Sequence, residues 1–387
     1  MPTPSRAARL PAPTDDARLH SERLAARIRD EIEAGGGWMD FARFMELTLY
    51  APGLGYYAAG ATKLGKDGDF ITAPELSPLF GRTLARQVAQ VLEEAGGEVL
   101  ELGAGSGVMA ADVLDEMRGR DRLPERYSIL EPSPELAQRQ RDLLRQRHPD
   151  LHGRIDWIAS LPHAFEGVIV ANEVLDALPV HLIAWRSEGL FERGVAFDGG
   201  FAWAERGLAP GALRDAAEAL APGIDYISEV SLAVPALVRD LAAVLRKGAL
   251  LFVDYGFGRR EYYHPQRSTG TLMCHYRHHA HDDPFHLPGL QDLTAHVDFT
   301  AVAEAGIDAN LKLMGYTTQA QFLINCGITQ MLERESGGNA SRFAAIAAAQ
   351  KLLSPAEMGE LFKAIMLGRG LDAAPVGFSS GDKSRLL

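Results

Sequence analysis

The sequence has few cysteines, no long apolar run and no excess of positive charge. Only Cys274 and Cys326 occur among its 387 residues. They are too few for a disulfide framework, which favours a reducing compartment. No apolar stretch approaches the roughly 18 residues that suggest a membrane span, since even the run over 248–258 is short and contains Asp254. We therefore expect no membrane insertion.

The charge balance restricts the possible partners. The formal net charge is -12, whereas nucleic-acid binding needs concentrated Lys and Arg to neutralise phosphates. We expect no nucleic-acid partner, and a cationic partner fits better. Residues 1–18 resemble a flexible tail, because Asp15, Asp16 and several prolines are incompatible with a secretory apolar core or an amphipathic targeting helix.

Short apolar runs alternate with helical stretches along most of the chain. Strands are predicted over 98–103, 127–132, 155–160, 167–173 and 249–256, and helices over 21–34, 78–95, 108–118, 134–146 and within 231–248. This alternation is typical of a parallel sheet covered by helices on both faces. The sequence therefore predicts a doubly wound, Rossmann-like α/β fold.

Segments that break the alternation are predicted to be insertions or additions. The core is expected over 96–316 with 360–387, preceded by a helical segment over 19–95. An insertion over 181–230 should contain β-hairpins with turns at 187–189 and 198–200. Another, over 257–298, is rich in His and Tyr and is expected to be loop, while 317–359 predicts a helical insertion.

A strand runs directly into three glycines at alternate positions. Gly103, Gly105 and Gly107 precede a predicted helix, and such a bare turn lets a ligand approach the backbone at a helix N-terminus. A dinucleotide site has the spacing G-x-G-x-x-G, whereas here the third glycine comes one residue early. The spacing favours a ligand without a diphosphate.

Two acids accompany this turn. Glu101 would repel phosphate but suits the cationic amino-acid end of S-adenosylmethionine, directly or through water. Glu131 ends the next strand, where an acid accepts ribose hydroxyls in nucleoside sites. Together they favour an S-adenosylmethionine site. A phosphate-loop match at 60–67 is rejected, because Asp67 replaces the Ser or Thr that binds magnesium.

Polar residues also follow the strand over 167–173. Asn172 is expected to hydrogen-bond an acceptor or the donor, while Glu173 and Asp176 orient a basic group or take a proton. A plain turn around Asn172 or Asp176 is the alternative. His296 is a candidate for positioning an acceptor, although structural histidines are more common.

The histidine-rich stretch does not predict a metal site. Its histidines, over 275–286, have the spacing H-x-x-H-H-x-H without a helical scaffold, so a polar loop is the better interpretation. Cys274 is interpreted as an ordinary small apolar residue. We predict no metal.

Eight segments, in order along the chain, resemble one known family. They are GDFITAPELSPLFG, VLELGAGSG, ILEPSPEL, ANEVLDALPV, LFVDYGFG, QDLTAHVDFT, GYTTQAQFLINCGI and EMGELFKAI. The family is the MidA-like class I S-adenosylmethionine-dependent methyltransferases, formerly a domain of unknown function, which include the mitochondrial arginine methyltransferase that assists assembly of respiratory complex I. The resemblance spans about Leu24 to Arg369.

The resemblance implies S-adenosylmethionine as cofactor and methylation of an arginine in a protein partner, such as a complex I subunit. Donor-binding residues carried over are Gly103, Ala104, Gly105 and Gly107 of the turn, Glu131 for the ribose, and Thr72, Pro74 and Glu75, which close over the donor pocket. Glu173 resembles the acid that follows the fourth strand in other arginine methyltransferases. Its acidic partner is Asp176, Glu229 or Glu75.

Two other functions remain as alternatives. A non-catalytic assembly chaperone would bind a partner without the donor, and a nicotinamide-dependent oxidoreductase would use the same strand, turn and helix. Because no convincing mitochondrial targeting sequence precedes the core, we expect a bacterial-type cytoplasmic protein, or a matrix protein if it is eukaryotic.

Overall fold

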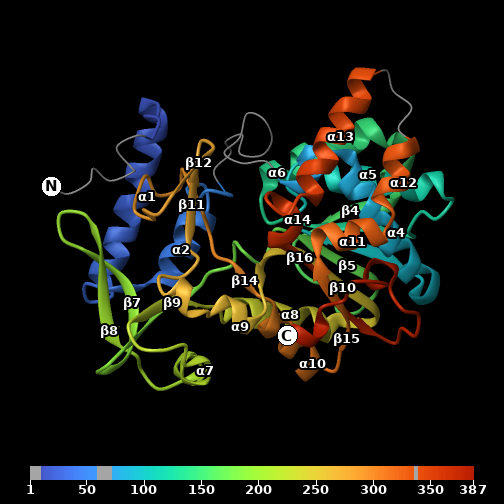
Figure 1. The fold of residues 1–387 in the computed structure, drawn as a ribbon. Coiled ribbons are helices and arrows are strands. Elements are labelled where there is room, and N and C mark those ends of the chain that lie inside the picture. Colours follow the sequence, from blue (N-terminus) through green and yellow to red (C-terminus); the bar gives the residue numbers. More distant parts are fainter. Residues whose placement is uncertain (1–9, 59–71, 335–338) are drawn as a thin grey trace. The chain divides into compact units, whose positions relative to one another are not determined.

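The computed structural model describes residues 10–58, 72–334 and 339–387, in two compact units (Figure 1). Unit 1 comprises Met1–Phe70, Asp176–Val234 and Arg260–His296, and unit 2 comprises Ile71–Leu175, Pro235–Arg259 and Val297–Leu387. The segment expected over 19–95 is thus shared between the units. No helix in the described ranges has the length and apolarity needed to cross a membrane.

A mostly parallel sheet forms the centre of unit 2. Its strands, in spatial order, are β15 (Lys312–Thr318), β16 (Phe362–Arg369), β10 (Leu245–Phe257), β5 (Phe165–Asn172), β2 (Glu98–Leu102), β3 (Tyr127–Leu130) and β4 (Ile155–Ile158), with β14 (Val297–Asp298) beside the end of β10. The predicted strands and doubly wound fold are confirmed. The sheet is not entirely parallel, because β16 runs antiparallel to both β10 and β15.

Helices pack on both faces of this sheet. They are α3 (Ala73–Leu76), α4 (Pro78–Ala95), α5 (Val108–Gly119), α6 (Pro134–Arg147), α8 (Ala233–Val244) and α10 (Phe299–Asp308). Apolar residues of α4 and α5 join alternate strand residues in one core, while Gly306 of α10 lies against Leu367 on the other face. Helix α4 has the predicted bounds of 78–95: Ser77 Oγ accepts the Leu79 N–H at its start, and Gly96 ends it.

The predicted helical insertion lies between β15 and β16. It contains α11 (Gln319–Asn325), α12 (Ile328–Arg334), α13 (Asn339–Leu353) and α14 (Met358–Leu361). Leu323 and Met331 from this segment join the core that contains α4 and α5, so the insertion extends the packed face of the sheet.

Unit 1 contains an antiparallel sheet and two N-terminal helices. The sheet consists of β1 (Met39–Asp40), β7 (Gly189–Phe197), β6 (His181–Arg186) and β9 (Tyr226–Val230), with β8 (Phe201–Gly207) beside β7. The helices are α1 (Asp15–Ala34) and α2 (Phe41–Tyr50), and α7 (Ala212–Leu220) follows β8. The predicted hairpins are confirmed at both turns.

Two expectations about unit 1 are wrong. Helix α1 begins at Asp15, inside the expected tail, because Thr14 Oγ1 accepts the Ala17 N–H and two acids occupy the first turn. The expected loop over 257–298 instead contains α9 (Arg259–Tyr262) and a sheet of β11 (Met273–Tyr276), β12 (His279–His281) and β13 (Asp292–Thr294). Buried Cys274 and Tyr276 alternate with less buried residues along β11 and anchor this sheet.

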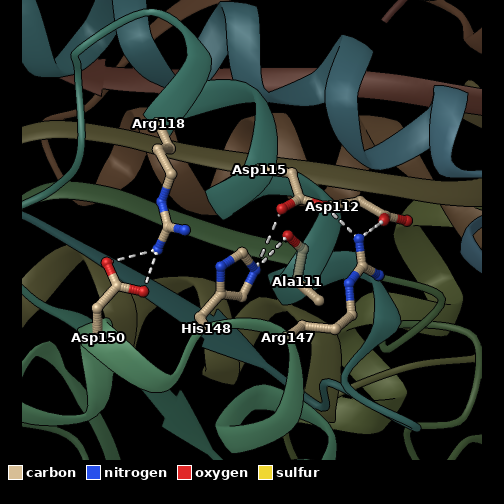
Figure 2. A network of polar contacts seen from close by, with 7 residues as sticks. All are labelled: Ala111, Asp112, Asp115, Arg118, Arg147, His148 and Asp150. Carbon is tan, nitrogen blue, oxygen red and sulfur yellow. Dashed lines mark hydrogen bonds and ion pairs between the residues drawn. The ribbon is translucent and has the colours of Figure 1, made fainter.

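An ion-pair network joins α5 to α6 in unit 2 (Figure 2). Arg147 at the end of α6 reaches both Asp112 and Asp115 of α5, with 2.8 Å between Arg147 Nη2 and Asp112 Oδ1. Asp112 is fully buried, and this burial raises the pKa of its carboxyl although Arg147 opposes the shift. The adjacent His148 Nε2 lies 3.0 Å from Ala111 O. The network therefore fixes two helices that begin near the glycine turn.

We predict that Arg147→Met lowers the free energy of unfolding by about 3 kcal/mol at pH 8, because it leaves Asp112 buried without its cation. A raised pKa means that the folded state keeps a proton that the unfolded state has released. The deficit should therefore shrink as the pH falls toward about 3.9, the ordinary pKa of an aspartate, because protonating the buried Asp112 then costs progressively less. Urea unfolding of the wild type and of Arg147→Met at several pH values measures this difference in the free energy of unfolding.

Arg118→Met is the matched control, since Arg118 pairs with Asp150 on the surface and such exposed pairs contribute less than about 1 kcal/mol. A pH-independent loss in Arg147→Met, equal to that of the control, would contradict the role given to Asp112.

Candidate donor and acceptor sites

The register of three strands brings the predicted donor residues to one edge of the sheet in unit 2. Leu102 of β2 pairs with Leu130 of β3 and with Ala171 of β5. The next residues are therefore level with one another: Gly103, Glu131 and Asn172. The chain changes direction across the sheet at β2, and ligands of open α/β sheets bind at such a switch point, beyond the carboxyl ends of the strands.

The glycine turn has the left-handed backbone that favours glycine. The φ angles are +60° at Gly103, +54° at Gly105 and +86° at Gly107, the N-cap of α5. A Cβ at Gly103 would lie 3.1 Å from Val174 Cγ2, and one at Gly107 would lie 3.3 Å from Gln140 Cα. At these two glycines a Cβ would thus make a tight contact in addition to the strain of the turn, while Ala104 is buried.

Glu101 is a buried carboxyl directly before this turn. Tyr127 donates a 2.6 Å hydrogen bond to Glu101 Oε2, and Oε1 has no partner among the described residues. Burial raises the pKa of Glu101 to about 7, against the effect of the Tyr127 hydrogen bond, and the charge of Glu131 adds to the rise. A cationic ligand group would satisfy Oε1 and favour the ionised form.

Glu131 is held by two donors at the end of β3. Its Oε1 accepts the Ser133 N–H at 2.9 Å and its Oε2 accepts Gln140 Nε2 at 3.0 Å. Burial raises its pKa, while both hydrogen bonds oppose the rise. The sequence interpretation missed Gln140. The available signal was its position on the buried face of α6, together with Ala137 and Leu144.

The start of α3 contacts the turn through one side chain. Ser106 Oγ donates to Glu75 Oε1. Thr72 is the N-cap of α3 and its carbonyl accepts the Glu75 N–H at 3.1 Å, while Pro74 is buried. Glu75 is therefore joined to the glycine turn. The rejected phosphate-loop match at 60–67 lies outside the described residues.

Glu173 and Asn172 form a second polar group at the end of β5. Asn172 Nδ2 donates to Glu173 Oε1 at 3.0 Å, and the Ala73 N–H donates to the same oxygen at 3.3 Å. Glu173 has a φ of +52°, which is unfavourable for a residue with a Cβ. Its N–H donates to Val253 O at 2.9 Å. This backbone conformation orients the side chain within unit 2.

Asp254 supports the same loop and was missed as a site residue. One of its oxygens accepts the N–H groups of Val174 at 3.1 Å and Leu175 at 2.9 Å, and the other accepts that of Tyr255. Asp254 is buried in β10. The available signal was a charged residue inside an otherwise apolar strand, where a carboxylate needs hydrogen-bond donors.

The other two acceptor candidates, Asp176 and His296, belong to unit 1. Both are placed by backbone bonds: Asp176 O accepts the Ala295 N–H at 3.0 Å, and the His296 N–H donates to Thr271 Oγ1 at 3.1 Å. Asp176 is buried, and its charge contributes to the raised pKa of Tyr57, which is caused mainly by burial and then by Asp292.

Glu229, also in unit 1, has a structural role. Its Oε1 accepts the N–H groups of Thr271 and Leu272, each at 2.8 Å, and its Oε2 accepts the hydroxyls of Tyr262 and Thr271, each at 3.1 Å. The Ser228 hydroxyl also donates to Oε2, at 3.2 Å, and these five hydrogen bonds satisfy a buried carboxylate. Glu229 therefore stabilises the chain around Thr271, which in turn holds His296.

The histidine-rich stretch is part of the β11–β13 sheet. Cys274 lies in the core of unit 1, and burial raises the pKa of its thiol. His281 and His286 contact each other edge to face, and burial lowers the pKa of both. Within the described ranges, three potential metal ligands converge at Asp40, His181 and Glu192. There, however, Asp40 caps α2 and His181 Nδ1 lies 2.7 Å from Glu192 Oε1.

Comparison with known proteins identifies the family. The family described as "Putative S-adenosyl-L-methionine-dependent methyltransferase" matches residues 82–317. The chain belongs to this methyltransferase family.

Relatives and solved structures extend the match over the whole fold. The chain is 30% identical to "Protein arginine methyltransferase NDUFAF7, mitochondrial" of Danio rerio, over 84% of this chain and 82% of the relative. It is 28% identical to the Caenorhabditis elegans homologue, over 79% and 76%. A "likely methyl transferase" from Burkholderia thailandensis, bound to S-adenosyl-homocysteine, matches with a TM-score of 0.95 and 49% identity, covering 98% of this chain and 100% of that one.

The cofactor of this methyltransferase is S-adenosylmethionine, as predicted, which removes the nicotinamide alternative. The described residues fit it. Glu101 Oε1 is buried without a partner beside the bare turn, which suits a cationic amino group. The carboxylate of Glu131 stands at the next strand end and retains acceptor capacity for ribose hydroxyls.

We predict that affinity for S-adenosylhomocysteine falls by up to about tenfold between pH 7.5 and pH 6. The free protein has a Glu101 pKa of about 7, so below this pH the carboxyl must lose a proton before it pairs with the ligand's amino group. Calorimetric titration across the range measures the slope. Glu101→Gln should bind more weakly and with the same affinity at each pH, and a slope equal to that of the wild type in this variant would contradict the assignment.

Proposed function

We propose that this methyltransferase transfers a methyl group to an arginine of a protein partner, such as a subunit of respiratory complex I. The main support is the 30% identity to a protein arginine methyltransferase across 84% of this chain. The net charge of -12 is compatible with a basic partner segment. The family resemblance noted in the sequence supports complex I as the assembly that contains the partner.

We assign the donor half of the reaction to residues of unit 2. Glu101 binds the amino group, the turn from Gly103 to Gly107 approaches the donor, and Glu131 binds its ribose. Glu75 and Thr72 support the turn through α3. When bound, S-adenosylmethionine supplies a methyl group on a positively charged sulfur, which is already a good leaving group, so that positioning provides most of the acceleration.

The acceptor half is assigned to Glu173 with Asn172. A guanidinium keeps its charge in water because its pKa is above roughly 12. A carboxylate that binds two of its nitrogens draws the positive charge toward them and leaves the third more nucleophilic. Glu173 is suited to this role, because Asn172 and the Ala73 N–H hold one of its oxygens.

The proposal of Asp176 as the second acid rests on the sequence alone. Glu229 already accepts five hydrogen bonds within unit 1, and Glu75 is bound to Ser106. Asp176 follows Glu173 closely in the chain, and its backbone holds Ala295 beside His296. His296 is proposed to position the acceptor. A bacterial-type cytoplasmic location remains our expectation.

Glu173→Gln is expected to keep the affinity for S-adenosylhomocysteine within about threefold while lowering the transfer rate by at least roughly 100-fold, since the neutral amide no longer localises the guanidinium charge. Calorimetry and a methylation assay measure the two quantities separately. Glu192→Gln, a change of the same type in unit 1, is the control. A Glu173→Gln enzyme with the wild-type rate would remove the residue from the acceptor site.

The substrate class is tested by incubating the protein and a lysate of its own cell with isotopically labelled S-adenosylmethionine, followed by mass spectrometry of the modified peptides. We expect label on arginine with the wild type and none with Gly105→Val, because valine is strained at a φ of +54°. Label on another residue type would contradict arginine transfer. Partner capture without any label would favour the assembly chaperone.

A further inference from the structure

Gln140 makes three hydrogen bonds from a fully buried position on α6. Its Nε2 donates to Gly105 O at 2.9 Å and to Glu131 Oε2 at 3.0 Å, and its Oε1 accepts Trp157 Nε1 at 2.9 Å. Its exposed fraction is 0%. One amide therefore connects the glycine turn, the acid at the end of β3 and a tryptophan of β4.

The orientation of this amide is fixed by chemistry. An indole N–H only donates, so the atom that faces Trp157 is the oxygen. The other amide atom faces the Gly105 carbonyl and the Glu131 carboxylate. A carbonyl and an ionised carboxylate only accept hydrogen bonds, so this atom is the nitrogen with its two hydrogens. Both N–H groups and the carbonyl are then used. Neither a flipped amide nor an apolar side chain can make the same three hydrogen bonds.

The contacts also determine how much of Glu131 remains for a ligand. An ionised carboxylate offers about four acceptor positions, two on each oxygen. Within the described part of the chain, Ser133 takes one position on Oε1 and Gln140 takes one on Oε2. One position on each oxygen is left, which matches two neighbouring hydroxyl groups.

We infer that Gln140 is a positioning residue of the donor site, which orients Glu131 toward both hydroxyls of the ribose and holds the Gly105 carbonyl of the turn. The inference rests on the proposed assignment of Glu131 to the ribose. Gln140 also packs against Gly107, where a Cβ would lie 3.3 Å from its Cα and Cγ. Because Gly107 has no side chain, α6, which carries Gln140, can pack this close to the turn.

The test compares two ligands on each variant: S-adenosylhomocysteine and its 2′-deoxyribose analogue, which lacks one hydroxyl. Calorimetry on the full-length wild type should show a preference for the ribose form of roughly tenfold or more, because a hydrogen bond to a charged group is lost with the analogue. Gln140→Met, similar in size but unable to hydrogen-bond, should reduce this preference to less than about threefold. Both affinities come from one preparation, so the ratio does not depend on the folded fraction.

Gln87→Met is the matched control. Gln87 is also fully buried in a helix of unit 2, where it donates to Gln90 Oε1 and accepts the Gly377 N–H, and this variant should keep the wild-type preference. Trp157→Phe, which removes the donor to Gln140 Oε1 but keeps an aromatic ring, should give an intermediate preference. It also provides a second variant if Gln140→Met does not fold.

Glu131→Gln separates the two possible failures. If this variant loses the preference while Gln140→Met and Trp157→Phe keep it, Glu131 binds the ribose and the role of Gln140 is wrong. If Glu131→Gln itself keeps the wild-type preference, the assignment of Glu131 fails and the inference fails with it. Loss of the preference in Gln87→Met would also overturn the inference, because any buried amide would then have the same effect.

Discussion

Parallel hydrogen bonding on both sides of β2 is the constraint on which the proposed donor site depends. Because Leu102 pairs with both Leu130 and Ala171, three strands end at the same level and release the chain at Gly103, Glu131 and Asn172. A shift of one residue in either pairing would turn the side chains of that strand to the opposite face. The apolar core around α4 and α5 opposes such a shift, so site geometry and core packing are parts of one arrangement.

Local signals in the sequence were sufficient for the main elements of this arrangement. Ser77 and Gly96 marked the ends of α4, and the glycines with Glu101 and Glu131 marked the turn, because each signal acts within a few residues. The missed residues act over longer separations. Gln140 contacts a carbonyl 35 positions away and Asp254 binds an amide 80 positions away, so the fold must be known before their partners are.

The errors in unit 1 have a related cause. Histidine and tyrosine obscured the alternation along β11, where Cys274 and Tyr276 are buried, because both residue types occur at surfaces and in cores. The start of α1 was masked by Asp15 and Asp16, which were interpreted as features of a tail. Beside the Thr14 cap, however, acids stabilise the first turn of a helix.

Glu173 combines a proposed role in methyl transfer with an unfavourable backbone conformation. A glutamate with a φ of +52° occupies a conformation that costs of order 1 to 3 kcal/mol, and glycine or asparagine would adopt it more easily. Selection for greater thermal stability would therefore favour replacement of Glu173, because the replacement would raise the free energy of unfolding. If Glu173 persists in relatives from hot environments, selection on activity must outweigh that gain.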